Sequence, residues 1–152
     1  MNSEAVAVAA VHAALPPPLR LDASRVRVHG SASAGAVRLA RRLVLRLSRG
    51  RAIALGNHVF LPARCERDPA VLAHELTHCA QYQAWGPWRY YRRGAAAQLR
   101  DLLHRSLGLC GSPYAYCVDE GKPFHAYGME QQAQMVEDRV RRACGAGRSP
   151  AP

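Results

Sequence analysis

The sequence has almost no lysine, no closely spaced cysteine pair and no apolar run long enough to cross a membrane. Lys122 is the single lysine, so arginine carries nearly all of the basic charge. The formal net charge of +10 could favour an acidic partner such as nucleic acid or an anionic membrane surface. No nucleic-acid-binding motif accompanies the charge, so we expect compositional bias rather than a nucleic-acid function.

The longest mostly apolar stretch near the start covers residues 5–15, which is too short for a membrane span. No basic segment precedes it and three prolines follow it, so it does not resemble a secretory signal peptide. We therefore expect a cytoplasmic protein, with export only through a specialised secretion machine. Residues 1–19 are expected to form a flexible tail, residues 20–144 one domain, and residues 145–152 a second tail.

The cysteines are odd in number and widely spaced, which argues against both a disulfide framework and a zinc ribbon. They are Cys65, Cys79, Cys110, Cys117 and Cys144. Cys110 and Cys117 flank a Gly-Ser-Pro turn and could pair under oxidising conditions, but reduced thiols are the expectation.

Hydrophobic periodicity predicts an α+β fold, a small sheet or hairpin packed on three to four helices. Alternation at 24–29 predicts a strand, and two apolar runs around Gly56-Asn57 predict a hairpin over 52–61. Helices are expected at 34–48, from an Asp68 cap to about residue 84, at 93–107 and at 127–144. Arginines line one side of the 34–48 helix, and we expect this side to be a solvated face.

The helix after Asp68 contains the motif His74-Glu75-Leu76-Thr77-His78, which has the form HExxH. Residues four apart lie on one face of a helix, so both imidazoles can reach a single metal ion. Zinc suits two imidazoles and a carboxylate, and Glu75 is placed to act as general base toward water. The motif thus predicts a zinc site with His74 and His78 as ligands.

A third ligand has to come from another part of the chain. The third histidine of the extended metzincin motif is absent, because Gln81 and Ala84 stand where its glycine and histidine would be. A glutamate on a later helix, the gluzincin arrangement, is therefore expected. Glu130, Glu137 and Asp138 compete for this role. We favour Glu130 because the small Ala133, one turn further on, would allow that helix to approach closely.

These segments resemble a family of short bacterial zincin-like domains of unknown function. The resemblance lies in the stretch from His74 to Tyr82, the aromatic segment from Trp85 to Tyr91, and Tyr127-Gly-Met-Glu-Gln-Gln-Ala133. The family is related to the core domain proteins encoded with extracellular contractile injection systems. The resemblance implies a minimal zincin-like fold with a central HExxH helix, zinc at His74, His78 and Glu130, and Glu75 as base. It also implies a supporting or packing role for Gln81.

This chain departs from the family pattern at one position. The usual E-x-E-A has become Glu130-Gln131-Gln132-Ala133, which leaves any role for a second acid open. Tyr127, His125 and Tyr82 could each donate a hydrogen bond to a developing oxyanion, although such residues more often pack.

The leading functional hypothesis is a zinc metallopeptidase acting on a peptide or protein. In this hypothesis Glu75 deprotonates water, and a strand such as 58–61 holds the substrate by strand addition. The alternative is a non-catalytic, zinc-stabilised interaction module of a contractile injection or secretion system. A nucleic-acid-associated metalloprotease is a third interpretation, prompted by the arginine face. Substrate, activity and oligomeric state do not follow from the sequence.

Overall fold

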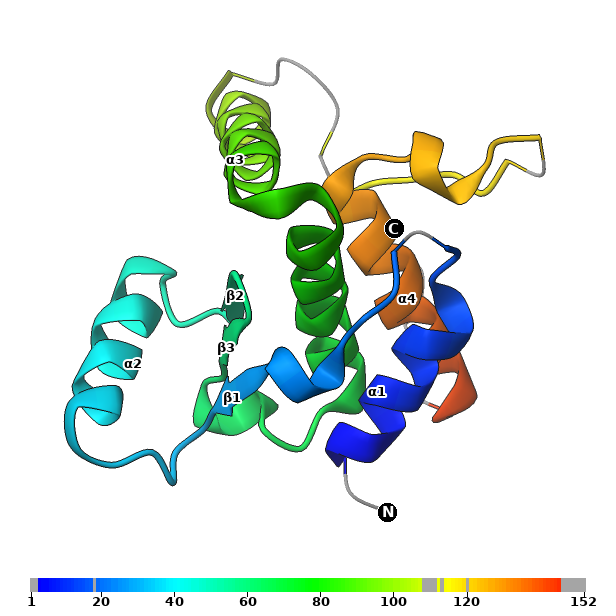
Figure 1. Cartoon of the computed structure of the whole chain (residues 1–152). Helices are drawn as coiled ribbons and strands as arrows, with labels where there is room; N and C mark the ends of the chain where they lie inside the picture. Colours follow the sequence, from blue (N-terminus) through cyan, green and yellow to red (C-terminus); the bar gives the residue numbers. More distant parts are fainter. Residues whose placement is uncertain (1–2, 18, 108–111, 113, 120, 146–152) are drawn as a thin grey trace.

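The computed structural model describes residues 3–17, 19–107, 112, 114–119 and 121–145. Within this range four helices and a three-stranded sheet form an α+β domain, as the hydrophobic pattern predicts (Figure 1). The main elements are α1 (Ser3–Ala14), β1 (Arg27–His29), α2 (Gly35–Leu47), β2 (Ile53–Leu55), β3 (His58–Phe60), α3 (Pro69–Leu107) and α4 (Met129–Ala143). Three short 3-10 turns, η1 (Ala23–Arg25), η2 (Ala63–Cys65) and η3 (Phe124–Ala126), join them.

The sheet has the order β1-β3-β2. β2 and β3 form the predicted antiparallel hairpin around Gly56-Asn57, and β1 pairs with β3 in parallel, with α2 in the connection. Gly56 has a φ of +64°, and a Cβ at this position would lie 3.2 Å from the ring of Tyr82. Glycine therefore satisfies both the turn and the close approach of α3 to the hairpin.

α3 is two helical arms that meet at a kink. The Asp68 carboxylate caps its start by accepting from the backbone N–H groups of Ala70 and Val71, as expected. Gly86 is non-helical, with φ 75° and ψ 165°, and Pro87 follows it. The first arm (69–85) carries the HExxH motif. The second arm (87–107) starts at Pro87, several residues earlier than the sequence pattern indicates.

The N-terminal segment differs from the expectation of a flexible tail over residues 1–19. Residues 3–14 form α1, and Ala7 and Val11 are fully buried against the rest of the core. The helix lacks a polar face and is followed by prolines, so its sequence resembles an unstructured alanine-rich leader. Long-range packing of its apolar side stabilises it, which local periodicity does not reveal.

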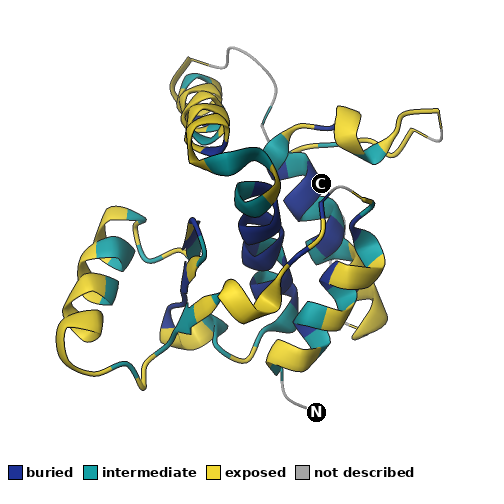
Figure 2. Cartoon of the chain, viewed as in Figure 1, coloured by how far each residue is buried: buried dark blue, intermediate teal, exposed yellow. Residues whose placement is uncertain are grey.

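One continuous core joins α1, the inner face of the sheet, the first arm of α3 and α4 (Figure 2). Leu76 and Cys79 of α3 and Val136 and Val140 of α4 lie at its centre and are at most 2% exposed. The buried first arm is thereby held between α1, α4 and the sheet, and this fixes the direction of its histidines.

Two further expectations concern residues outside the described ones. Cys110 is one of these, so the suggested Cys110–Cys117 pairing has no structural counterpart here. The C-terminal tail at 145–152 also lies outside, apart from residue 145. None of the helices in the described ranges combines the length and apolar character needed to span a bilayer.

Candidate metal centre

Three buried side chains from two helices converge at the interface of α3 and α4. His74 and His78 project from the first arm of α3, and Glu130 projects from the first turn of α4. Glu130 Oε2 lies 3.7 Å from His74 Nε2 and 3.4 Å from His78 Nε2. One ligand atom from each residue lies within 4.8 Å of the others. The structure therefore brings together the two histidines of the motif and the acid favoured from the sequence.

The charges of this cluster favour a bound cation. Burial disfavours the imidazolium form of His74, but Glu130 and Glu137 outweigh burial and raise its pKa to about 10. Burial lowers and Glu130 raises the pKa of His78, with a net increase. Burial alone would raise the pKa of Glu130, yet the two imidazoles hold it well below its usual range. A buried carboxylate that is ionised and faces two ring nitrogens is a favourable environment for a metal ion.

A chain of amide side chains supports His78 from behind. Gln81 Oε1 lies 2.8 Å from His78 Nδ1, and Gln81 Nε2 donates to Gln132 Oε1 and to the carbonyl of Met129, at 3.0 and 3.1 Å. Gln132 Nε2 in turn donates to the carbonyl of Tyr127 at 2.9 Å. Gln81 and Gln132 are at most 1% exposed. The expected supporting role of Gln81 thus has a geometric basis, and Gln132 extends it across to α4.

A second chain of contacts reaches His74. Glu137 Oε2 lies 3.0 Å from His74 Nδ1, although this nitrogen lacks a partner with hydrogen-bond alignment among the described residues. Arg141 donates to Glu137 Oε1 at 2.8 and 3.1 Å, and it lies 3.4 Å from the capping carboxylate of Asp68. Glu137, the runner-up for third ligand, therefore faces the opposite ring nitrogen of His74 from Glu130. Its position suits a residue that orients His74.

Glu75 lies beside the cluster on the side of the sheet and is 6% exposed. Burial raises the pKa of its carboxyl; the two histidines and the backbone N–H of Ala54 in β2 act in the opposite direction. Tyr90, at the start of the second arm, donates its hydroxyl to the Ala54 carbonyl at 3.2 Å. The outer edge of β2 at Ala54 is therefore already engaged by two side chains of α3.

The remaining sequence candidates lie elsewhere in the fold. The Tyr127 hydroxyl accepts from the N–H of Asp119 at 3.0 Å and donates to the Cys117 carbonyl at 3.3 Å. His125 is exposed in η3, and Tyr82 packs on Gly56 and the tyrosines of the second arm. Among the described residues no hydrogen bond joins these three side chains to the cluster, although the backbone carbonyl of Tyr127 accepts from Gln132. Their role toward an oxyanion stays a prediction.

The expectation that strand 58–61 could hold a peptide by strand addition is wrong. β3 is the central strand and pairs with β1 on one side and β2 on the other. Its backbone groups are therefore used within the sheet. The parallel pairing with β1 joins segments about thirty residues apart and is not visible in local periodicity.

Sequence reasoning missed several contributors to the site. Tyr90 and Gln132 are both buried there. Tyr114 lies near Glu130: burial raises the pKa of the Tyr114 hydroxyl, and the charge of Glu130 raises it further. Gln132 carries a usable signal, because it is polar within the apolar stripe formed by Met129, Ala133 and Val136 of α4. A buried glutamine on such a stripe indicates a specific hydrogen-bond partner.

The residues of the cluster fit a divalent cation. Tetrahedral ligands about 2.1 Å from a zinc ion lie about 3.4 Å apart, close to the separations of Glu130 from the two histidines. The contact of Gln81 with Nδ1 of His78 leaves Nε2 facing the cluster. His74, His78 and Glu130 would hold the ion, with Gln81 and Glu137 behind the imidazoles, the arrangement typical of histidine ligands.

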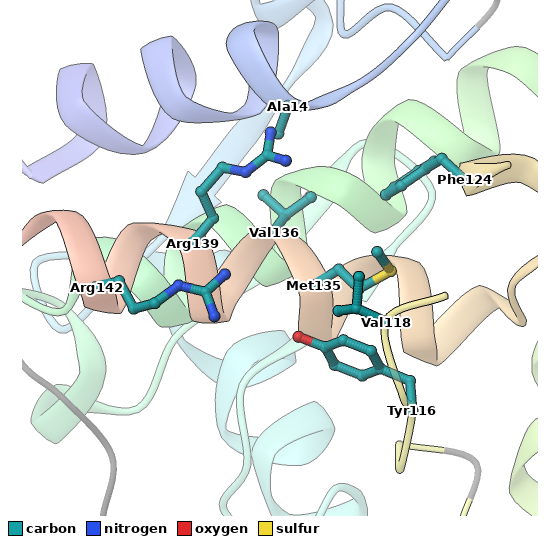
Figure 3. Close-up of a pocket in the computed structure, with 8 residues that line it drawn as sticks. All are labelled: Ala14, Tyr116, Val118, Phe124, Met135, Val136, Arg139 and Arg142. Atoms are coloured by element: carbon teal, nitrogen blue, oxygen red, sulfur yellow. The ribbon is translucent and has the colours of Figure 1, made fainter. Parts of the chain in front are cut away.

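A separate cavity of about 150 Å³ lies against α4 (Figure 3). Its lining comes from the end of α1, the 116–118 segment, η3 and α4, and consists of Ala14, Tyr116, Val118, Phe124, Met135, Val136, Arg139 and Arg142. At about 100° per residue, Arg139 lies opposite Glu130 on α4. The Tyr116 hydroxyl donates to Asp138 at 2.8 Å. None of the residues of the histidine cluster lines this cavity.

Residues 8–86, just over half of the chain, match the eCIS core domain family. The chain belongs to the eCIS core domain family. This confirms the relationship suggested by the HExxH segment and its surroundings. The matched region extends from α1 through the first arm of α3 and includes His74, Glu75 and His78, whereas Glu130 on α4 lies beyond it. Curated proteins and solved structures give no match.

Proposed function

We propose that this eCIS core domain binds zinc at His74, His78 and Glu130 and acts as a component of a contractile injection system. The observation that carries the proposal is the buried cluster joining α3 to α4 in a member of this family. A metal bound there would connect the matched region of the family to the helix that follows it.

The burial of the ligands favours a structural function for the metal. The side chains of His74, His78 and Glu130 are only 12, 8 and 9% exposed. A structural zinc site usually has four protein ligands, whereas this cluster supplies three and would leave one position for water. The low exposure of the three side chains favours a structural function because it limits access to that position. The two chains of contacts through Gln81 and Glu137 further fix the ligands in one arrangement, as expected of a metal that stabilises a fold.

Zinc content tests the metal site directly. We expect about one zinc per chain in the purified wild-type protein, retention in Glu137→Gln and loss in Glu130→Gln. The two variants remove one charge each from α4 and differ by two helical turns, so each is the matched control of the other. Absence of zinc from the wild type after supplementation would overturn the proposed site. Loss of zinc only in Glu137→Gln would show that Glu137, not Glu130, is the third ligand.

The structural function also predicts how the protein responds when the metal is removed. A chelator should lower the melting temperature of the wild type, and Glu75→Gln should keep both its zinc and its incorporation into injection particles purified from the source organism. Full incorporation of the metal-free Glu130→Gln variant would show that the site is unnecessary for this association.

A metallopeptidase is the second candidate, favoured by the position of Glu75 beside the two histidines. A bound zinc ion would supply a Lewis acid that polarises a carbonyl and acidifies water. Glu75 could then take a proton from water, which burial assists because it raises the pKa of the carboxyl, and pass that proton to a leaving amine. Before a peptide can reach this edge of β2, the second arm of α3 has to move Tyr90 away and Glu75 has to release the N–H of Ala54.

Peptide hydrolysis by the zinc-loaded protein separates the two candidates. Cleavage that disappears in Glu75→Gln while zinc content stays the same would establish the peptidase. If the wild type cleaves nothing in a diverse peptide library, or if Glu75→Gln cleaves equally well, the structural function is the one supported.

A further inference from the structure

α2 carries a ridge of exposed leucines. All thirteen of its residues are exposed or half-buried. Leu39, Leu43 and Leu47 follow one another at four-residue spacing and are 66, 60 and 76% exposed. A contiguous apolar surface of this kind on a small domain marks an interaction site, because it costs free energy while it faces water.

A row of arginines runs beside the leucine ridge. Arg38, Arg42 and Arg46 also repeat every four residues and are exposed, and the helix contains no acidic residue. The ridge and the arginine row occupy adjacent sectors of the solvent side of the helix. Together they form a surface that is apolar along one line and positive along the next.

The anchoring of α2 directs this surface away from the domain. Arg41 donates to the Leu61 carbonyl at 2.6 and 3.0 Å and lies 3.5 Å from Glu66. Arg41 is about 160° around the helix from Leu39 and from Leu43, so the anchor and the ridge lie on opposite sides. In Figure 1, α2 stands apart from α1, α3 and α4, beyond the sheet. The ridge is thus presented on a convex, projecting element.

The charge of α2 identifies the kind of occupant. A second copy of the chain would bring two arginine rows together, and each chain already carries a formal charge of +10. An anionic surface instead pairs with the arginines while it covers the leucines. Arginine binds phosphate through two parallel hydrogen bonds, and an amphipathic helix with arginines beside leucines lies in the interface of an anionic bilayer.

We propose that α2 binds the surface of an anionic lipid bilayer, with Leu39, Leu43 and Leu47 in the acyl boundary and the arginine row on the phosphates. α2 contacts β3, Leu61 and Glu66, and in Figure 1 the sheet lies between α2 and α4. This interaction is therefore independent of the metal and of the function proposed above, and either can fail without the other.

Sedimentation of the full chain with vesicles tests the proposal. We expect binding to phosphatidylglycerol-containing vesicles and much weaker binding to phosphatidylcholine alone. The triple variant L39N/L43N/L47N keeps every charge and should lose at least about tenfold in apparent affinity. The matched control is L99N/L102N/L107N on the second arm of α3, where the leucines are 57, 60 and 63% exposed. The control should bind like the wild type.

Two further measurements separate insertion from charge attraction and from self-association. L43W should give a blue-shifted emission that brominated lipids quench, and L102W should not. Equal binding by both triple variants would overturn the proposal in favour of non-specific charge attraction. So would a concentration-dependent dimer that disappears only in L39N/L43N/L47N, because the ridge would then contact a second copy. Circular dichroism of the triple variants checks that both remain folded.

Discussion

Gln81 Oε1 lies 2.8 Å from His78 Nδ1, and this contact determines which nitrogen of the imidazole faces Glu130. The Met129 carbonyl can only accept, so the Gln81 atom 3.1 Å from it is the amide nitrogen. The other end of the same amide is then an acceptor, and His78 Nδ1 has to carry the proton. In the neutral imidazole, His78 Nε2 then has its lone pair toward the cluster, as a metal ligand requires.

Replacing Gln81 with leucine should weaken zinc binding without removing a ligand. The change leaves His78 free to rotate and leaves the buried Gln132 Oε1 without its donor, so we expect affinity to fall about 10–100-fold. Competition with a chromophoric chelator measures this. Gln98→Leu on the exposed second arm of the same helix is the control and should bind like the wild type. Unchanged affinity in Gln81→Leu would mean that packing alone orients His78.

Gln132→Glu should destabilise the fold although it restores the acid of the E-x-E-A pattern. Gln132 donates to the Tyr127 carbonyl and accepts from Gln81. A carboxylate keeps only the accepting half and places its charge beside a carbonyl oxygen. We expect a loss of about 2–3 kcal/mol in the free energy of unfolding, measured with urea. Gln98→Glu introduces the same charge on an exposed surface and should change it by less than about 0.5 kcal/mol.

The predictable part of the site is the part set by local geometry. Four-residue spacing places His74 and His78 on one face, and Asp68-Pro69 marks the start of the helix that carries them. The small Ala133, which is fully buried, favours Glu130 over Glu137 as the third ligand. Both glutamates nevertheless reach His74, on different ring nitrogens. Such a distinction depends on the rotation of α4 against α3, which no local pattern encodes.

The unpredictable part depends on contacts between distant segments. β1 pairs with β3 although α2 and β2 lie between them in the sequence. The buried side chains of α1 pack in one core with residues of α3 and α4. The interaction of Ala54 with Glu75 and Tyr90 likewise joins residues more than twenty positions apart. The composition of residues 1–19 is rich in alanine and proline, which is typical of a flexible tail, and it carries no signal of these long-range contacts.

Val11→Ser tests whether α1 is part of the folded domain. Val11 is fully buried, so the change removes apolar packing and places a hydroxyl in the core. We expect the free energy of unfolding to fall by about 2–4 kcal/mol. His12→Ser, at the exposed neighbouring position, should have an effect below about 0.5 kcal/mol. Equal, small effects in both variants would show that α1 contributes little to the stability of the domain, as expected of a flexible tail over residues 1–19.

Leu76 lies between the two histidines in the HExxH motif, and its own function is to pack the helix that carries them. It is 1% exposed and belongs to the core shared by α1, α3, α4 and the sheet. Leu76→Ala should create a cavity and lower the free energy of unfolding by about 2–5 kcal/mol. Leu99→Ala makes the same chemical change on the second arm, where Leu99 is 57% exposed, and should change the free energy of unfolding by less than about 0.5 kcal/mol.

The free energy of unfolding of both variants should be measured in the metal-free protein and with zinc. A bound ion adds its own stabilisation to each, so the difference between the two variants should persist in both states if the apolar core, and not the metal, holds the first arm in place. Disappearance of the difference on zinc addition would instead assign that function to the metal.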